Sequence, residues 1–543
     1  MTEQKRLGEF LLDAGIISKK QIEVALSVQK TQKIFLGEIL QNLNFVTAEE
    51  IAHVIAQQQD LPFVDIDQIP IDPDALRLIS KELALEKKIL PIEVNDEFFT
   101  VAAVDTSDIT RTDYLEKISQ RKVDYLICDR EKLSNMIELH YYQLDNPVQE
   151  RIENMISLDS NDVDIIELLD LLIHNAIKNR ATDIHITPDA YVVHVFYRID
   201  GVLQHNFAFS LDLHSKMVSR IKILSNLDIS EQRLPQDGGF SLSFLDQDYD
   251  LRISTLPTSQ GENLVLRILA SQASLFGLES LGLETENLTS LKEIFTRPHG
   301  MILVTGPTGS GKTTTLYSAL REIDALSKNI ITVEDPIEYR FSFVKQTQIN
   351  AKTGYDFAKA IRHFMRQDPD VMLVGEIRDE ETAKLAIRAS ITGHLVLSTL
   401  HSNSAIATIP RLYDMEIEAD LLATTLHAIV AQRLIRRVCK SCAVKVTLDA
   451  KALDLTDSQS YEVYEANESG CEHCNYTGYL GRSAIVEVLN IDETLKALIS
   501  EKASVLSIKE QARKNGFVPM RVHALSKVID GTTTLAEINR VSS

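Results

Sequence analysis

The hydrophobic positions of the first 60 residues repeat along the chain. A Leu-Gly-Glu tripeptide at residues 7–9 returns at residues 36–38, and each copy continues with a Ser or Thr and then with apolar residues spaced i, i+4. That spacing marks one face of a helix, and a Ser or Thr in front of it can cap the helix. The pattern predicts two similar helical hairpins over residues 1–60.

Beyond this repeat the pattern divides the chain into further segments. Short β-rich runs that alternate with polar helical stretches predict a small α/β module over 61–145, and the polar stretch 146–164 predicts a linker. A second α/β domain is expected over 165–270. The largest domain, 271–543, opens with an apolar strand at 301–304 that runs into glycines, and we expect it to end in helices. Strands alternating with helices predict a parallel sheet there.

Length and composition fit a multidomain globular protein. The chain has 543 residues, of which 44% are hydrophobic and 25% charged, so it can build several packed cores. It carries 56 Lys and Arg against 78 Asp and Glu, a net charge of −22, and it has no Trp. Nucleic-acid affinity is built from clustered cations. We therefore expect no nucleic-acid partner.

The first residues lack the apolar core of a signal peptide, and no stretch reaches the ~18 uncharged apolar residues of a membrane span. We expect the protein to stay in the cytoplasm and to reach a membrane only through partners.

A phosphate-binding loop is predicted directly after the apolar strand at 301–304. Residues 306–313 fit the pattern G-x-x-x-x-G-K-[ST], between that strand and a helix-forming segment. Such glycines let backbone N–H groups curl around phosphate oxygens, and the helix N-terminus adds partial positive charge. Lys312 is expected to bridge the β- and γ-phosphates of ATP, and the Thr313 hydroxyl to bind Mg²⁺. The predicted nucleotide-binding residues are Gly306, Pro307, Thr308, Gly309, Ser310, Gly311, Lys312, Thr313 and Thr314.

Hydrolysis also needs carboxylates that orient water and complete the shell of the metal ion. Glu376 follows an apolar strand and has glycine just before it, where an acid commonly stands, so it is the candidate catalytic carboxylate. Glu334 ends a second acidic strand, and strand ends converge on the ligand in a doubly wound sheet. For either acid the alternative is a solvated loop carboxylate. His401 ends another apolar strand and fits either an ordinary hydrogen-bonded histidine or a γ-phosphate sensor; we place it with the catalytic candidates.

Four segments in this order resemble the boxes of the secretion ATPases that drive type II secretion and type IV pilus assembly. They are the phosphate loop, Thr-Val-Glu-Asp-Pro-Ile-Glu, Gly-Glu-Ile-Arg-Asp, and Gly-His-Leu with Thr-Leu-His. Further similar segments lie upstream at 181–185, 198–201, 233–238 and 252–257, so the resemblance covers about 165–540.

The resemblance implies an α/β fold in which a RecA-like P-loop ATPase domain is preceded by a PAS-like α/β domain and by the helical plus α/β N-terminal region. It also implies a homohexamer. By resemblance, Arg252 and Arg267 are the arginines that reach phosphate, and Glu334 and Glu376 are the essential acids. The alternative for both arginines is a salt bridge between strands.

Four of the five cysteines form two pairs with metal-ligand spacing. Cys439 and Cys442 make one CxxC pair, and Cys471 and Cys474 make the other. Four thiolates close a tetrahedral shell around Zn²⁺ and leave no open position, so the pattern predicts a structural zinc site in an insertion at about 436–482. A redox dithiol is the alternative. In the resembling family, such an element is typical of the assembly and secretion branches.

The start of the N-terminal repeat, with Arg6, Leu7 and Gly8, resembles the nucleotide-binding repeat with which some of these ATPases bind cyclic di-GMP. An exposed Arg can stack on guanine or pair with phosphate, and a glycine permits close backbone approach. The second copy has Phe35 in place of Arg and Asn44 in place of Gly15. A helical docking module for a membrane partner fits the pattern as well.

The motifs predict an ATP-hydrolysing cytoplasmic protein, and the resemblance implies a hexameric motor that works at the inner-membrane face. By resemblance, its partners are an inner-membrane platform protein and a recruiting protein, and its work is pilin or pseudopilin polymerisation in either a type IV pilus or a type II secretion machine. The rival functions are a RecA-like nucleic-acid translocase and a nucleotide-switched scaffold.

Overall fold

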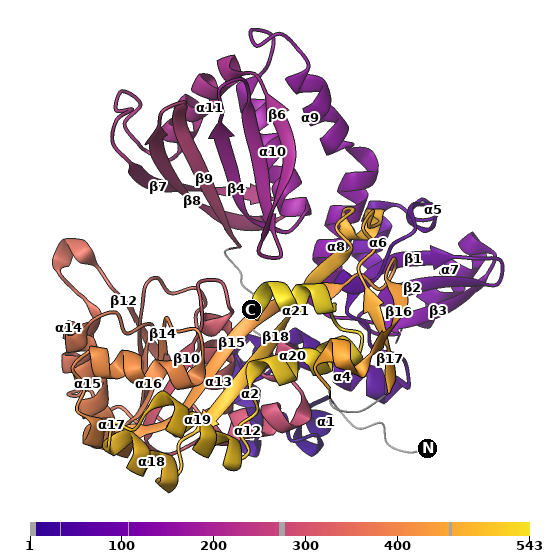
Figure 1. The fold of residues 1–543 in the computed structure, drawn as a ribbon. Coiled ribbons are helices and arrows are strands. Elements are labelled where there is room, and N and C mark those ends of the chain that lie inside the picture. Colours follow the sequence, from indigo (N-terminus) through magenta and orange to yellow (C-terminus); the bar gives the residue numbers. More distant parts are fainter. Residues whose placement is uncertain (1–6, 33, 107, 271–276, 456–458, 543) are drawn as a thin grey trace, which may run out of the picture. The chain divides into compact units, whose positions relative to one another are not determined.

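The computed structural model describes all residues except 1–6, 33, 107, 271–276, 456–458 and 543 (Figure 1). The chain forms two compact units. The terminal unit comprises the residues up to 47 together with those from 274 onward, and the central unit comprises residues 48–273.

The terminal unit is built on a seven-stranded sheet with the strand order β12-β11-β13-β14-β10-β15-β18. All neighbouring strands run parallel except β15 and β18, which are antiparallel. The parallel sheet predicted from the alternation of strands and helices is thus confirmed. Its strands are β10 (Gly300–Thr305), β11 (Ile330–Glu334), β12 (Val344–Gln348), β13 (Val371–Val374), β14 (Leu395–Leu400), β15 (Leu426–Val438) and β18 (Tyr479–Asn490).

Both faces of this sheet are buried, as a parallel sheet requires. Along β10, Met301 and Leu303 join one hydrophobic cluster, whereas Ile302 and Val304 join the cluster on the opposite face. Helix α12 (Thr285–Phe295) precedes β10. The helices between the later strands are α13 (Lys312–Glu322), α14 (Phe357–Phe364), α15 (Glu380–Ile391), α16 (Ala405–Asp414) and α17 (Ala419–Thr425).

The C-terminal part of the terminal unit combines a small ribbon with four helices. The ribbon pairs β16 (Val444–Asp449) with β17 (Ser460–Glu465) in antiparallel fashion. The helices are α18 (Glu493–Ser500), α19 (Val505–Lys514), α20 (Met520–Ile529) and α21 (Leu535–Val541).

The predicted helical repeat is present as four helices. These are α1 (Leu7–Asp13), α2 (Lys19–Thr31) and α3 (Leu36–Asn42) in the terminal unit, and α4 (Ala48–Gln59) in the central unit. Ser18 caps α2 in a reciprocal capping box with Gln21. Gly15 and Asn44 occupy equivalent positions and are both left-handed, with φ of 69° and 60°. Asn tolerates this conformation better than most residues, so the two hairpins keep the same turn.

The first part of the central unit is a three-stranded sheet surrounded by helices. The strands are β1 (Ile89–Val94), β2 (Phe98–Ala103) and β3 (Lys122–Ile127). The helices are α5 (Pro73–Leu76), α6 (Lys81–Lys87), α7 (Ile109–Ser119) and α8 (Arg130–Asp145).

The segment 146–164 departs from the predicted linker because it contains a helix, α9 (Val148–Ile156). Val148 and Ile152, four positions apart, are buried in the hydrophobic core of the following domain. Polar neighbours dominate the local composition and hide this short apolar stripe.

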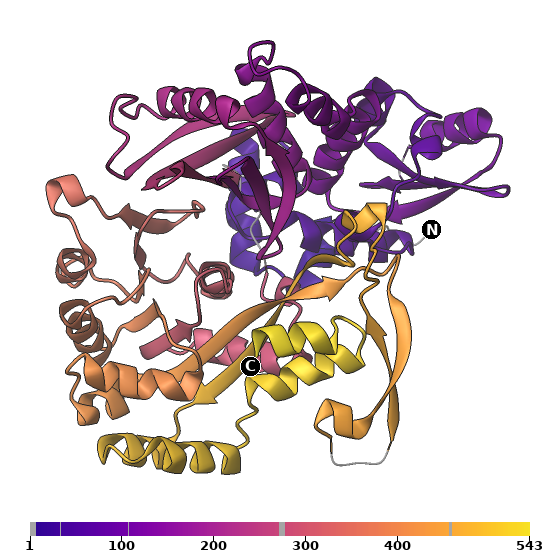
Figure 2. The same ribbon diagram turned by 45° about the horizontal axis from the view of Figure 1, so that its top comes forward.

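The second part of the central unit is a six-stranded antiparallel sheet with α10 (Ile165–Lys178) and α11 (Leu211–Leu224) packed against it (Figures 1 and 2). Leu172 of α10 and Met217 of α11 lie in one core with Ile184 and Val195 of the sheet. The strands are β4 (Ala181–Pro188), β5 (Val193–Ile199), β6 (Val202–Phe209), β7 (Gln236–Phe244), β8 (Gln247–Thr258) and β9 (Gly261–Ala270).

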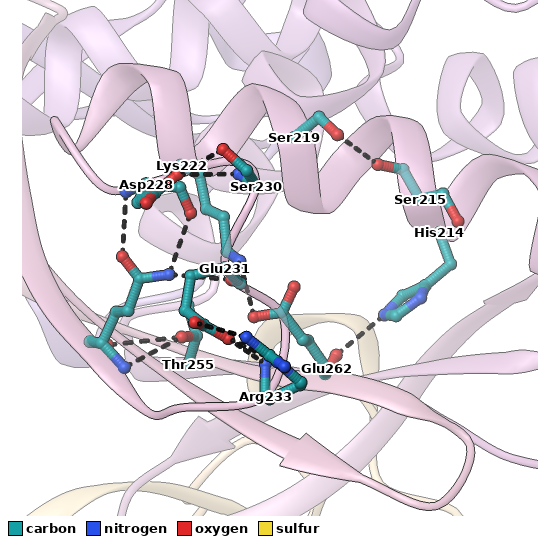
Figure 3. Close-up of polar contacts among 11 residues, drawn as sticks. His214, Ser215, Ser219, Lys222, Asp228, Ser230, Glu231, Arg233, Thr255 and Glu262 are labelled. Atoms are coloured by element: carbon teal, nitrogen blue, oxygen red, sulfur yellow. Dashed lines mark hydrogen bonds and ion pairs between the residues drawn. The ribbon is translucent and has the colours of Figure 1, made fainter.

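A buried ion pair organises the loop that follows α11 (Figure 3). Lys222 Nζ lies 2.7 Å from Glu262 Oε1 and donates a hydrogen bond of 2.7 Å to the carbonyl of Glu231. Gln236 donates to the carbonyl oxygens of Asp228 and Glu231 and closes the loop. The loop 228–236, which carries one of the family-like segments, is therefore held from inside by a buried cation.

Candidate functional site

The phosphate loop joins β10 to α13, and close approach explains two of its glycines. Gly306 and Gly311 have φ of 152° and 85°, where glycine is favoured. A Cβ at Gly306 would lie 2.4 Å from the carbonyl oxygen of Gln432, and one at Gly311 would lie 2.8 Å from the Gln432 side-chain nitrogen. Larger residues at either position would push the loop away from β15.

Gln432 of β15 supports the loop from below. Its side-chain nitrogen donates to the carbonyl of Ser310 at 2.9 Å, and its side-chain oxygen accepts from the Thr315 hydroxyl at 2.6 Å. Gln432 is only 1% exposed, so both of its polar groups are used inside the protein. Gln432 was not predicted from the sequence, where its signal is a polar side chain inside an apolar strand.

The side chains of the loop are arranged for an anion. Lys312 Nζ donates to the carbonyl oxygens of Gly306 and Pro307, at 2.9 and 3.0 Å. Burial lowers the pKa of Lys312, and the nearby carboxylate of Glu376 opposes that effect. The hydroxyl of Ser310 is buried and has no hydrogen-bond partner among the described residues. An unsatisfied buried donor beside a lysine suits a phosphate group.

The remaining loop residues flank these groups. Thr308 and Gly309 are exposed, and Thr313 and Thr314 are half-buried in the first turn of α13. An accessible Thr313 hydroxyl at the helix start is compatible with the predicted Mg²⁺ ligand.

Glu376 lies beside the loop, close to two other predicted residues, Lys312 and His401. His401 Nε2 is 3.5 Å from one Glu376 oxygen, and Arg378 forms an ion pair with the other. Only 17% of the Glu376 side chain is exposed, and its charge acts on Lys312. Thr399 holds the turn by donating to the Gly375 carbonyl at 2.7 Å. Lys312, Glu376 and His401 thus form one constellation.

Arg378 was not singled out from the sequence. It lies two positions after Glu376 and also approaches Asp335 at 3.7 Å, so it spans both acidic segments. Hydrogen bonding to Glu376 raises the pKa of Arg378, so the guanidinium stays charged.

Glu334 is placed differently from Glu376. It is 2% exposed, and its carboxylate accepts hydrogen bonds from Tyr317 of α13, from Thr332 at 2.5 Å and from Gln346 at 3.1 Å. Across the described ranges, no hydrogen bond or ion pair joins it to Lys312 or Glu376. The structure therefore fixes Glu334 between β11 and the helix of the phosphate loop.

Arg252 and Arg267 are in the central unit, on the neighbouring strands β8 and β9. The two residues are directly opposite each other in the antiparallel register, and both are exposed. Arg267 Nε donates to Asp183 Oδ1 at 2.9 Å, and Arg198 approaches the other oxygen at 3.7 Å. The strand salt bridge considered for Arg267 is present, but it leaves 56% of the Arg267 side chain exposed.

The four cysteines of the two CxxC pairs converge. Their sulfur atoms all lie within 4.8 Å of one another. The Cys439–Cys471, Cys442–Cys474 and Cys471–Cys474 Sγ distances are 3.8, 3.9 and 3.7 Å. Tetrahedral zinc with Zn–S bonds of about 2.3 Å requires sulfur atoms about 3.8 Å apart. All four thiols are free, so the donor set fits Zn²⁺ and not a disulfide.

Backbone groups already favour a thiolate in this cluster. Burial would raise the pKa of Cys474, but the N–H groups of Cys471 and Gly478, each 3.2 Å from its sulfur, bring it down to about 7. Such N–H···S contacts orient and stabilise metal-bound sulfur.

Comparison with known proteins decides the family. A family model described as type II/IV secretion system protein matches residues 159–540, and the model of the MshEN domain matches residues 59–147. The chain belongs to the type II/IV secretion system protein family.

Two relatives show how far the similarity to this secretion ATPase extends. The type IV pilus assembly ATPase PilB of Myxococcus xanthus is 36% identical over 556 residues, which cover 98% of each chain. The type II secretion system protein E of Dickeya dadantii is 46% identical over 383 residues, 70% of this chain and 76% of that protein. The ATPase DotB of Legionella pneumophila shares the fold, with a TM-score of 0.51 and 20% identity over 69% of this chain and 95% of that one.

The N-terminal candidates of this secretion ATPase are only partly described. Arg6 lies outside the described residues. Leu7 begins α1 and is half-buried, whereas Gly8 is buried, and a Cβ there would lie 3.2 Å from a methyl group of Leu36. Gly8 thus allows the two copies of the repeat to pack closely. Among the described residues, no helix is both long and apolar enough to cross a lipid bilayer.

Proposed function

We propose that this secretion ATPase is a homohexameric motor that hydrolyses ATP and transmits the motion to an inner-membrane platform, powering pilin or pseudopilin polymerisation. The observation that carries the proposal is the constellation of Lys312, Glu376 and His401 around the phosphate loop. The relatives named as pilus assembly and type II secretion proteins support the proposal that the motor works in a pilus or secretion machine. Such a motor works at the cytoplasmic face of the inner membrane, together with a recruiting protein.

Each residue of the constellation has a distinct task. Lys312 and the loop N–H groups would hold the β- and γ-phosphates, and Thr313 would ligate Mg²⁺, which would neutralise the developing charge. Glu376 orients the attacking water and accepts its proton, with Arg378 and His401 holding the carboxylate in place. His401 follows β14, its Nε2 lies 3.5 Å from the Glu376 carboxylate, and it is suited to sense the γ-phosphate.

Arg252 and Arg267 are proposed to supply charge from the central unit. Both are exposed and stand side by side on β8 and β9. A movable unit that carries cations to the phosphoryl group stabilises the transition state only when closed, which couples closure to hydrolysis. Glu334 is proposed as the second essential acid, which acts from its fixed position next to α13.

Two further ligands belong to this proposal. Zn²⁺ is proposed as a structural ion, because the four cysteines would fill all four positions of its shell. Cyclic di-GMP is proposed as a ligand of residues 1–60, around Arg6, Leu7 and Gly8. If titration calorimetry detects no cyclic di-GMP binding to the full chain, the helical repeat is a docking module.

Steady-state ATPase assays on the purified chain test the enzymatic part. Glu376→Gln is expected to lower kcat by at least about 100-fold because it removes the base but keeps the shape. Glu380→Gln is the matched control, since Glu380 is exposed on α15 and forms an ion pair with Lys384 of the same helix. Wild-type turnover in Glu376→Gln would contradict the assigned role.

The rivals are separated by what stimulates turnover. A motor of this class should accelerate when its membrane platform protein is added in detergent or nanodiscs. Stimulation by single- or double-stranded DNA instead would favour a nucleic-acid translocase. An ATPase rate that changes neither with the platform protein nor with DNA would favour a nucleotide-switched scaffold.

A further inference from the structure

The second copy of the N-terminal repeat contacts the segment that follows Glu334. Asn44, just after α3, donates from its side-chain nitrogen to the Tyr339 hydroxyl at 2.7 Å. Its side-chain oxygen accepts from the backbone N–H of Ser342, also at 2.7 Å. One amide side chain thereby holds two points of the segment 335–343, which we call the acid segment. All of these residues belong to the terminal unit.

Three neighbouring contacts support the same junction. The rings of Phe45 and Phe343 are stacked, with centroids 5.8 Å apart and planes within 2°. The Ser342 hydroxyl donates to the Asn42 carbonyl at 3.1 Å. Farther along the repeat, Lys20 donates to the Leu326 carbonyl at 3.2 Å, in the loop before β11. The repeat therefore touches the chain on both sides of the strand that carries Glu334.

The acid segment is in turn tied to the Glu334 carboxylate by two side chains. Gln346 donates from the same nitrogen to Glu334 at 3.1 Å and to the Tyr339 carbonyl at 2.8 Å. Tyr317 donates to Glu334 and accepts from the Glu338 N–H at 3.1 Å. Tyr339 thus receives Asn44 at its hydroxyl and Gln346 at its carbonyl. Only two residues stand between the N-terminal repeat and the carboxylate.

The two copies of the repeat show that the turn itself does not require the Asn44 side chain. Gly15 occupies the equivalent left-handed position in the first copy, with open space where its side chain would be. Glycine therefore satisfies the backbone in that turn. The amide of Asn44 is required by the contact with the acid segment and not by the local fold.

We infer that Asn44 is a positioning residue through which the N-terminal repeat holds the acid segment and, by way of Tyr339 and Gln346, the Glu334 carboxylate in its working position. The inference rests on the proposed role of Glu334 in hydrolysis. It makes the turnover rate depend on the docking of residues outside the ATPase motifs, and it identifies the acid segment as the internal partner of the repeat.

Asn44→Gly in the full chain tests the inference, because glycine keeps the left-handed turn and removes only the amide. We expect kcat for Mg²⁺-ATP to fall roughly threefold to tenfold, with KM for ATP changed by less than about twofold, since a misplaced acid affects chemistry and not binding. Gly15→Asn is the matched control and should leave both constants unchanged. Asn44→Asp should restore most of the rate, because its carboxylate can accept from both the Ser342 N–H and the Tyr339 hydroxyl.

Tyr339→Phe supplies the double-mutant cycle. If the two residues act through one contact, the double variant Asn44→Gly/Tyr339→Phe should be no slower than the slower single variant. Thermal unfolding midpoints close to that of the wild type show that the loss is not general destabilisation.

Three results would overturn the inference: an unchanged kcat in Asn44→Gly, a raised kcat, or fully additive effects in the cycle. Glu376→Gln, measured in parallel, keeps this failure distinct from failure of the proposed function. An inactive Glu376→Gln together with a normal Asn44→Gly leaves the motor intact and removes only the positioning role.

Discussion

The Tyr317 hydroxyl of α13 donates its hydrogen to the buried carboxylate of Glu334 at the end of β11. The helix that starts at the phosphate loop is therefore connected directly to an acidic residue that lies outside the loop. The same hydroxyl accepts a hydrogen bond from the Glu338 N–H. A movement of α13 is therefore expected to displace Glu334 and Glu338, and a movement of these residues to displace α13. Burial, with the nearby Glu334 charge, raises the pKa of Tyr317, so the hydroxyl remains protonated and can donate.

Tyr317→Phe is expected to lower both activity and stability. The ring is retained, but a buried carboxylate loses a donor and a backbone N–H loses its acceptor, at a cost of about 1–3 kcal/mol in the free energy of unfolding. We expect kcat to fall more than KM rises, measured by steady-state hydrolysis. Tyr413→Phe is the control, because the Tyr413 hydroxyl donates to the Ile499 carbonyl at 2.8 Å, away from the loop. An unaltered kcat in Tyr317→Phe would separate Tyr317 from catalysis.

Gln432→Leu should weaken nucleotide binding. The substitution removes the two hydrogen bonds that join β15 to Ser310 and Thr315 and leaves a buried hydroxyl without its acceptor. A loss of about 1–3 kcal/mol in the free energy of ATP binding is expected, which corresponds to a roughly fivefold to 150-fold rise in Kd. Titration with a fluorescent ATP analogue measures it. Gln511→Ala, on an exposed helix face, should bind like the wild type.

Zinc analysis tests the four-cysteine cluster. The purified chain should hold one zinc ion per molecule, and Cys442→Ser should lose it, because the substitution removes one of the four thiolates that close the tetrahedral shell. Loss of the ion should lower the thermal unfolding midpoint but preserve ATP binding at the phosphate loop. Cys128→Ala is the control, since that buried thiol lies in the other unit and should not alter zinc content. A purified wild type that contains no zinc, and that is as stable as Cys442→Ser, would instead favour the redox dithiol.

Low pH should weaken the ion pair by which Glu537 attaches α21 to Arg436 of β15. Burial would raise the pKa of this carboxyl, but hydrogen bonds from Arg540 and Arg436 lower it to about 2. The folded pKa lies below the unfolded value of ~4.3, so the stabilisation is complete above that value and disappears as the pH falls toward 2. The contribution at neutral pH is about 3 kcal/mol.

Thermal unfolding as a function of pH measures this contribution. The difference between wild type and Glu537→Gln should be largest at neutral pH and should shrink below about pH 4. Glu493→Gln provides the comparison, because 88% of the Glu493 side chain is exposed. A wild-type advantage that is independent of pH would show that shape and not charge stabilises this position.

Substitutions of the buried ion pair Lys222–Glu262 (Figure 3) should have non-additive effects on the free energy of unfolding. Lys222→Met leaves the Glu262 carboxylate buried without its cation, and the side chains are only 1% and 7% exposed. A loss of about 3–5 kcal/mol in the free energy of unfolding is expected. Lys222→Met/Glu262→Leu should recover part of it, as measured by chemical denaturation. Additive losses in the double variant would show that the two side chains stabilise the domain independently.

The chemistry that depends on neighbours in the chain could be predicted from the sequence. The phosphate loop and the CxxC pairs are contiguous strings whose function follows from backbone conformation and fixed ligand spacing, and the Glu376 segment follows a recognisable strand. The parallel sheet followed from the alternation of strands and helices, and the helices of the N-terminal repeat followed from local periodicity. Helix α9 did not, because its two buried residues are too few to register within a polar segment.

Only the tertiary structure decided which distant side chains serve these motifs. Gln432 reaches Thr315 across 117 positions, and Asn44 reaches Tyr339 across 295. Such partners carry no local pattern, because a hydrogen bond between separate elements depends on strand order and packing and not on spacing along the chain. For the same reason, the sequence named Glu334 and Glu376 as equals, whereas folding buried the first under α13 and set the second beside the phosphate loop.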